Sequence, residues 1–142
     1  APPNQRSSFT HVLILGGLGD ILSNETAGRT AEKIAKDIGL MVDWSRARGA
    51  KAIVLTLPPW GRMKDYDAVR GQMTLDVNKW IVQAAKEGRI DGYFDVRPWL
   101  VCDGDEVNLC KKYAFKDGIH WSEAGQRSVG EALHQAMFAD CE

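Results

Sequence analysis

Three short apolar segments, each closed by glycine, proline or a charged residue, alternate along the chain with longer amphipathic segments. The short segments cover residues 11–16, 51–57 and 92–96. Continuous apolar runs of this length are typical of strands that are buried on both faces of a parallel sheet. The pattern therefore predicts three parallel strands at these positions.

Helices are predicted over residues 27–48 and 67–87, and Ser122 is expected to cap a third helix near the end of the sequence. Apolar residues recur at helical spacing in all three. The predicted inner faces carry Ala31, Ile34, Ile38, Met41 and Val42 in the first helix, Val69, Met73, Val77, Trp80, Ile81 and Ala84 in the second, and Val129, Leu133, Ala136 and Met137 in the third. Gly49 and Gly88 follow the first two helices as expected C-terminal caps.

The alternation of strands and helices favours an α/β fold, because right-handed crossovers place helices on both faces of a parallel sheet. We expect one domain over residues 9–142, preceded by an N-terminal arm at residues 1–8. The first strand is apolar from Val12 to Leu15, and natural proteins usually charge or cover an edge of that kind. We therefore expect a protein partner to pair with this strand edge or to cover it.

Composition narrows the range of partners and cofactors. The 142 residues carry a net charge of −1, so the composition lacks the excess of basic residues that is typical of nucleic-acid-binding proteins. No apolar segment approaches the roughly 20 residues that span a bilayer, so no transmembrane segment is expected. No cysteine pair has zinc-site spacing, and we expect neither a metal nor a cofactor. The sequence starts at Ala1, which favours a removed targeting segment of an organelle or secreted protein.

The cysteines leave two interpretations open. Cys102 and Cys110 bracket a short acidic loop and can form a disulfide in an oxidising compartment, which would leave Cys141 over. Three free or buried thiols are the alternative, and we favour it on the sequence alone. The acidic loop at residues 103–108 lacks the sixth-position glycine and the terminal glutamate of a calcium loop, so a solvated surface loop is expected.

Candidate chemistry gathers where the predicted strands end, because ligands in open α/β sheets bind at the carboxyl ends of the strands. The glycine-rich residues 16–20 do not form a phosphate loop, since Leu22 stands where a third glycine is needed. The turn that carries Asp117 and His120 can reach the same rim, although an isolated Asp-x-x-His pair is more often a structural hydrogen bond. Other candidate residues for the rim of a pocket are Asp20, Trp60 and Trp99.

Three segments, taken in order, resemble the SGNH (GDSL-type) hydrolase family. VLILGGLGDI at residues 12–21 resembles the third block of that family, and DGIHWSEAG at residues 117–125 resembles the fifth block. Between them, RARGAKAIVLTLPP at residues 46–59 resembles the helix end and strand that follow the third block. The resemblance implies a three-layer, flavodoxin-like (SGNH-type) parallel sheet, truncated to about three strands, with helices on both faces.

The resemblance also implies roles for individual residues. His120 matches the general base of a serine hydrolase, and Asp117 matches the acid that orients it. Gly17 and Gly19 occupy oxyanion positions, but Gly19 stands where the family has an asparagine. The family nucleophile lies in an earlier Gly-Asp-Ser block, which these residues do not contain. None of the serines lies in a nucleophile-like strand-to-helix turn: Ser7, Ser8, Ser23, Ser45, Ser122 and Ser128.

Three functions fit this pattern. The one we favour is a catalytically degenerate SGNH-like protein that acts as a structural or interaction subunit of a larger assembly, with Asp117 and His120 as a vestigial dyad. The first alternative is the C-terminal part of an active serine esterase or acylhydrolase, whose nucleophile lies on another segment or chain. The second alternative is a small-ligand binding module that uses the rim pocket, with Trp60, Trp99 and the glycines after the first strand. Fold alone does not decide among them.

Overall fold

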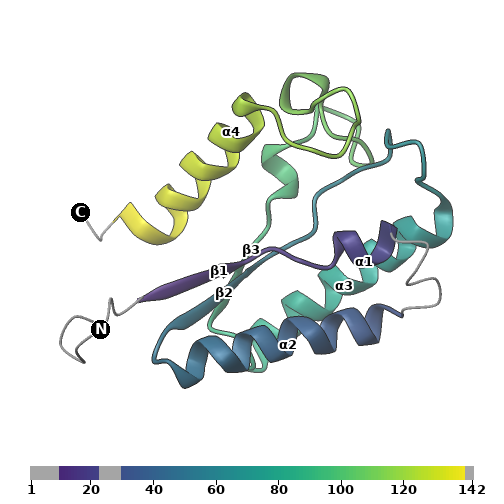
Figure 1. The fold of residues 1–142 in the computed structure, drawn as a ribbon. Helices are drawn as coiled ribbons and strands as arrows, with labels where there is room; N and C mark the ends of the chain where they lie inside the picture. The colour runs from purple at the N-terminus through teal and green to yellow at the C-terminus, as the bar shows by residue number, and fades with distance from the viewer. Residues whose placement is uncertain (1–9, 23–29, 140–142) are drawn as a thin grey trace, which may run out of the picture.

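A parallel sheet of three strands forms the centre of the computed structural model, which describes residues 10–22 and 30–139 (Figure 1). The strands are β1 (His11–Ile14), β2 (Lys51–Leu55) and β3 (Gly92–Phe94), and they pair in the order β1-β2-β3. Both pairings are parallel. The predicted α/β fold is confirmed, and each strand ends slightly before its predicted limit. The predicted arm at residues 1–8 lies outside the described residues.

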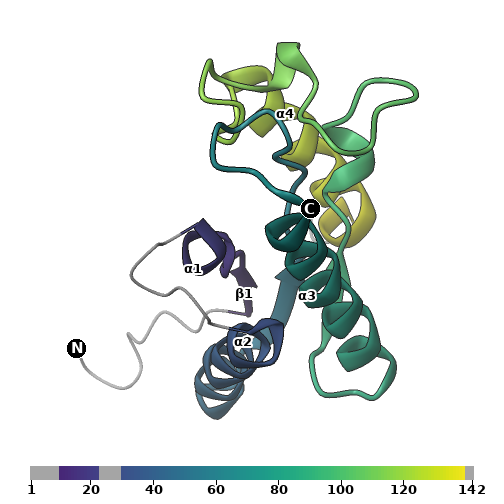
Figure 2. The same ribbon diagram turned by 90° about the vertical axis from the view of Figure 1, so that its right-hand side faces the viewer.

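Helices cover both faces of the sheet and make three layers (Figure 2). The α2 helix (Ala31–Ala47) and the α3 helix (Ala68–Lys86) lie side by side on one face. The α4 helix (Glu123–Leu133) lies on the other face and continues into a π-helical turn, His134–Phe138. Each face has its own apolar cluster, one centred on α2 and α3 and the other on α4.

The helix ends follow from capping residues. Ser122 accepts a hydrogen bond from the Gly125 N–H at 3.2 Å, which confirms it as the cap of α4. Thr30 caps α2, so this helix begins at Ala31 and not at residue 27; residues 23–29 lie outside the described residues. Gly49 and Gly88, at φ 80° and 72°, are the predicted caps that follow α2 and α3.

Three residues predicted on inner helix faces are exposed instead. Met41 is 42% exposed, Val69 is 73% exposed, and Ala136 is also exposed. In α3, the buried positions between Gly71 and Ile81 include two polar residues, Thr74 and Asn78, which an apolar pattern does not select. The predicted core residues Ile34, Ile38, Val77 and Ile81 are buried as expected.

A short helix, α1 (Leu18–Leu22), begins where a tight turn was predicted. Gly17 adopts φ 104°, and a Cβ at this position would lie 2.6 Å from the Ile34 side chain, so the chain can turn here only at glycine. The Ile21 N–H then donates to the Gly17 carbonyl at 3.1 Å and closes the helix. The predicted turn is therefore confirmed at Gly17, but the residues that follow form a helix instead of continuing the turn.

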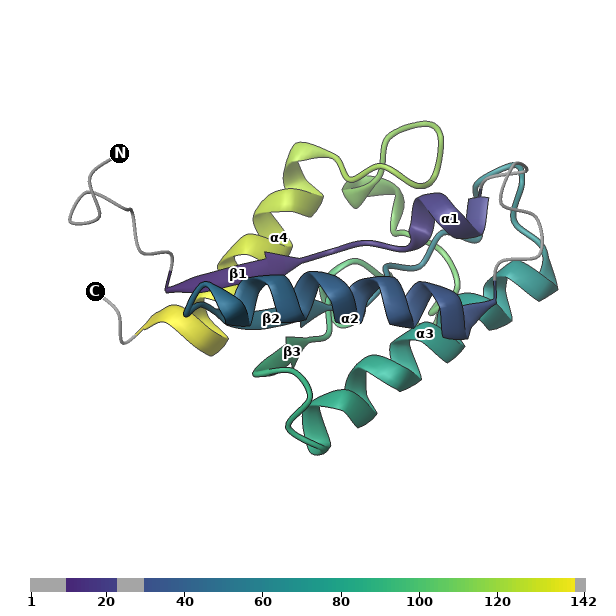
Figure 3. The same ribbon diagram turned by 60° about the horizontal axis from the view of Figure 1, so that its bottom comes forward.

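One edge of β1 is open in the described part of the chain, as Figure 3 shows for β1 and its neighbours. Val12 and Ile14 pack into the cluster beneath α2 and α3, whereas Leu13 and Leu15 are 47% and 48% exposed. The edge is therefore apolar and unpaired among the described residues. Whether a partner covers it stays a prediction.

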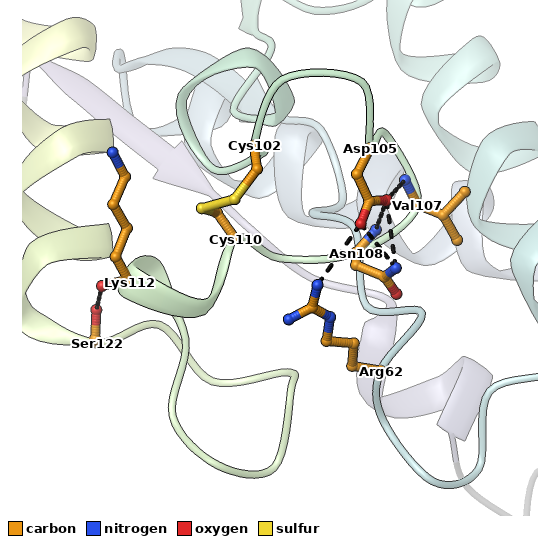
Figure 4. The surroundings of a disulfide bond; sticks show 8 residues. All are labelled: Arg62, Cys102, Asp105, Val107, Asn108, Cys110, Lys112 and Ser122. Atoms are coloured by element: carbon orange, nitrogen blue, oxygen red, sulfur yellow. Dashed lines mark hydrogen bonds and ion pairs between the residues drawn. A yellow bond between two sulfur atoms is a disulfide. The ribbon is translucent and has the colours of Figure 1, made fainter.

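Cys102 and Cys110 form a disulfide, which corrects the expectation of free thiols (Figure 4). The backbone brings them together: the Cys110 N–H donates to the Leu100 carbonyl at 2.8 Å, so the loop returns to its own start. Cys141 lies outside the described residues. Of the helices that the structure describes, none combines the length and apolar character needed to cross a membrane.

Candidate functional site

A tight turn between Ala114 and Trp121 carries the aspartate and histidine. Ala114 and Trp121 form an antiparallel bridge, and the Phe115 N–H donates to the His120 carbonyl at 2.9 Å. Gly118 sits at the tip with φ 75°, and a Cβ there would lie 2.9 Å from the carbonyl carbon of Arg62. Only glycine combines this left-handed conformation with so close a backbone approach. The glycine at the tip therefore fixes the close turn that carries the side chains of Asp117 and His120.

The Asp117 carboxylate makes three hydrogen bonds, two with His120 and one with Ile119. Its Oδ1 accepts from the backbone N–H groups of Ile119 at 3.1 Å and His120 at 3.0 Å, and its Oδ2 is hydrogen-bonded to His120 Nδ1. The imidazole bond first, and then the two amides, lower the pKa of the Asp117 carboxyl from 3.8 to about 2.

An ionised carboxylate can only accept hydrogen bonds, so the proton between the two side chains belongs to Nδ1 of His120. The lone pair of the neutral ring is then on Nε2, which is the arrangement that a general base needs. The His120 side chain is 75% exposed, so the ring is open to an incoming group. The pair can accept a proton, but it supplies no nucleophile.

A groove of about 800 Å³ lies against this pair. Its wall is formed by the turn after β1 with α1, by the segment after β2, by the Asp117–His120 turn and by one residue of α4. The lining residues are Leu15, Gly16, Gly17, Leu18, Gly19, Leu22, Leu57, Pro58, Met63, Phe115, Asp117, Ile119, His120, Trp121 and Gln126. The structure thus brings both candidate oxyanion glycines into the same groove as the dyad.

The two glycines differ in what they permit. Position 17 requires glycine because its φ is positive and because a Cβ there would collide with the Ile34 side chain. Gly19 has no atom within 4 Å of a Cβ position, and its φ is not in the left-handed region. The fold therefore leaves room for a side chain at position 19. Steric packing therefore does not explain why position 19 lacks the side-chain donor that the resembling family has there.

The tryptophans predicted at the rim lie elsewhere. Trp60 is 1% exposed, and its indole N–H donates to the Thr74 hydroxyl at 3.0 Å. Trp60 does not line the groove, because the chain stays buried beyond β2, from Thr56 to Trp60. Trp99 is 45% exposed and accepts a hydrogen bond from Ser128 in α4, outside the groove. Asp20 lies on α1 but is not among the residues that line the groove.

No serine among residues 10–22 and 30–139 lines the groove. Ser122 donates to the Lys112 carbonyl while it caps α4, Ser45 donates to a carbonyl within α2, and Ser128 donates to Trp99. Ser7, Ser8 and Ser23 lie outside the described residues. No group of three or more metal-binding side chains occurs in the described part of the chain.

Sequence reasoning missed two kinds of residue: loop residues that line the groove, and a residue that holds the backbone of the lining residue Leu57. Met63 and Phe115 lie in loops without periodicity, so no hydrophobic pattern marks them. Asn78 of α3 bonds both backbone groups of Leu57, accepting from its N–H at 2.6 Å and donating to its carbonyl at 3.1 Å. The available signal for this anchor was a polar residue, Asn78, three positions before Ile81 on the buried face of α3.

Comparisons with known proteins point in one direction. The model of the GDSL-like Lipase/Acylhydrolase family matches residues 1–128. A GDSL-like lipase from Bacteroides thetaiotaomicron superposes with a TM-score of 0.76 at 22% identity, over 92% of this chain and 63% of that one. A proposed acylhydrolase from Bacteroides fragilis gives 0.76 and 22%, over 94% and 63%. The chain thus spans less than two thirds of the length of these structures. No curated protein matches it.

Proposed function

Given that the chain belongs to the GDSL-like lipase/acylhydrolase family, we propose that it is a catalytically degenerate member that serves as a structural or interaction subunit. One observation carries this proposal: Gly19 lies in the groove with open space at its Cβ position, where the resembling family has asparagine. Loss of one oxyanion donor lowers turnover by about 10² to 10³. Asp117 and His120 then serve to fold the turn.

The partner in this proposal is a strand that pairs with β1. Successive residues of a strand direct their backbone groups to opposite sides. Lys51 of β2 donates to the Thr10 carbonyl at 3.0 Å, so the N–H and C=O groups of Leu13 point away from β2 toward the open edge. An incoming strand would satisfy these groups and would cover Leu13 and Leu15. Unpaired apolar edges are otherwise sites of aggregation.

A second candidate function is favoured by the ordered dyad and its groove. In this alternative, His120 is the general base of an acyl-ester hydrolase whose serine lies on a segment or chain beyond the described residues. The support is specific: the Asp117 carboxylate fixes Nδ1, and His120 is exposed to an apolar groove of about 800 Å³. The serine oxygen would have to come within about 3 Å of the imidazole. The ligand-binding alternative has less support, because neither Trp60 nor Trp99 lines the groove.

Ester hydrolysis distinguishes the two candidates. Short-chain nitrophenyl esters and acetylated sugars are incubated with the 142-residue chain, with the product of the gene's full reading frame, and with the His120→Ala form of each. The degenerate proposal expects no turnover above the His120→Ala background in any sample. Turnover that disappears with His120→Ala would overturn it and support the acylhydrolase.

Gly19→Asn adds a sharper comparison, because the groove has room for the asparagine. If only the donor is missing, the full-length product gains about 10² to 10³ in turnover. If turnover is still absent, the nucleophile is missing as well. A Leu13→Lys variant tests the partner: a charge on the open edge should abolish association with any strand that pairs there, measured by light scattering with the copurified partner. Unchanged association would place the interface elsewhere.

A further inference from the structure

The disulfide lies close to two segments that both hold the Asp117–His120 turn (Figure 4). It closes residues 102–110 into a loop on the molecular surface. Neither cysteine belongs to the groove, and neither of the proposed functions uses them. The contacts that leave this loop, however, lead to the turn along two separate routes.

The first route crosses the segment after β2. Within the loop, the Asp105 carboxylate accepts from the N–H groups of Val107 and Asn108, both at 3.2 Å, and lies 3.7 Å from the Arg62 guanidinium. The Val107 carbonyl then accepts from the Gly61 N–H at 2.9 Å. A Cβ on Gly61 would lie 2.5 Å from the Asn108 side chain, so loop and segment meet closely.

The same segment supports the tip of the turn. The main chain of Arg62 and Met63 lies where a Cβ of Gly118 would be, at 2.9 and 3.1 Å. Gly118 stands between Asp117 and Ile119, whose N–H binds the Asp117 carboxylate. A continuous series of close contacts therefore leads from the loop, through the main chain of residues 61–63, to the turn residues that bind the Asp117 carboxylate.

The second route follows the chain out of the disulfide. The Cys110 carbonyl accepts from the Tyr113 N–H at 2.8 Å and starts the short 3-10 helix Lys111–Tyr113. The carbonyls of Lys112 and Tyr113 then accept from the hydroxyl and the N–H of Ser122, both at 2.9 Å. Ser122 is the second residue after His120, so this route fixes the outgoing end of the turn.

We propose that the Cys102–Cys110 disulfide positions the Asp117–His120 turn, and that its reduction loosens this turn without unfolding the domain. The reductant is a dithiol: it transfers two electrons and two protons to the disulfide, leaves two cysteine thiols, and becomes a disulfide itself. Cys102 is exposed and accepts attack, whereas Cys110 is 5% exposed. The inference concerns the geometry of the turn, so it holds whether or not the site hydrolyses esters.

Amide hydrogen exchange in the full chain tests the proposal. The N–H groups of Ile119 and His120 report on the turn because both donate to Asp117. The N–H groups of Ala52 and Leu57 serve as controls, since they bind Asp91 and Asn78 in the sheet layer. A Cys141→Ser background confines the effect of dithiothreitol to the disulfide, and the amide chemical shifts of the turn give a spectroscopic signature.

On reduction we expect exchange at Ile119 and His120 to accelerate by about tenfold or more, with the control amides unchanged. Equal rates before and after reduction, or equal acceleration at all four amides, would overturn the proposal. Asp105→Ala interrupts the first route with the disulfide intact and should accelerate the same two amides. Asp105→Asn, which keeps the accepting oxygen, should restore them. Equal exchange rates at Ile119 and His120 in the Asp105→Ala and Asp105→Asn variants would also count against the proposal.

Discussion

Replacing Gly118 with alanine should destabilise the protein by an amount that the structure fixes. At φ 75° a non-glycine residue loses roughly 1–2 kcal/mol. The new methyl group would lie 2.9 Å from backbone and Cβ atoms of Arg62, which cannot move as freely as a side-chain tip. Overpacking of this kind costs about 1–3 kcal/mol. Together the two effects predict a loss of about 2–5 kcal/mol in the free energy of unfolding.

Gly88→Ala is the matched control. Gly88 has a similar φ of 72°, but no atom lies within 4 Å of its Cβ position. Its substitution should therefore cost only the conformational part, roughly 1–2 kcal/mol. Urea denaturation of the oxidised protein measures both variants, and unchanged m-values would show that the unfolded states are comparable. If the two variants lose the same stability to within about 0.5 kcal/mol, the backbone contact at Gly118 has been misjudged.

Three further predictions concern buried and ionised groups. Asn78→Leu should lower the free energy of unfolding by about 2–5 kcal/mol, because it leaves both backbone groups of Leu57 unbonded in the core; a loss below 1 kcal/mol in urea denaturation would contradict this. Trp60→Phe should cost about 1–2 kcal/mol, since it removes a buried indole N–H donor; a cost near zero would mean that its hydrogen bond is unimportant. The folded-state pKa of Asp117, about 2, lies below its ordinary 3.8, so its ionised form stabilises the fold above about pH 4 and this contribution disappears as the pH falls toward 2. In His120→Ala, carboxyl ¹³C titration should show this pKa rising toward 3.8, and an unchanged pKa would refute the assigned cause.

The elements that the sequence predicts well are those whose signal is local. Ser122 caps its helix through its own hydroxyl. Ile34 and Ile38 in α2, like Val77 and Ile81 in α3, recur at the spacing of a buried helix face. Glycine after a helix indicates its end, as Gly49 confirms. In each of these cases the residues that determine the structure lie within a few positions of one another.

The errors have the opposite origin, because they depend on contacts between distant segments. Trp60 is buried by α3, whose Thr74 accepts its hydrogen bond, and nothing beside Trp60 in the sequence indicates this. The disulfide forms because the loop returns to Leu100, a backbone contact that cysteine spacing does not reveal. The groove was anticipated only through Gly17, Gly19 and the dyad, because its apolar wall combines residues of α1 with residues of two distant loops.

The pairing of β1 has a consequence for how the chain is made. His11 lies opposite Lys51, so the ribosome adds 40 residues (51 − 11) after His11 before its pairing partner exists. At about 5–20 residues per second, β1 waits roughly 2–8 s with both of its edges bare. Only one of those edges is then closed by β2 in the described part of the chain. The yield of soluble protein should therefore depend on translation speed and on chaperones that bind short apolar strands.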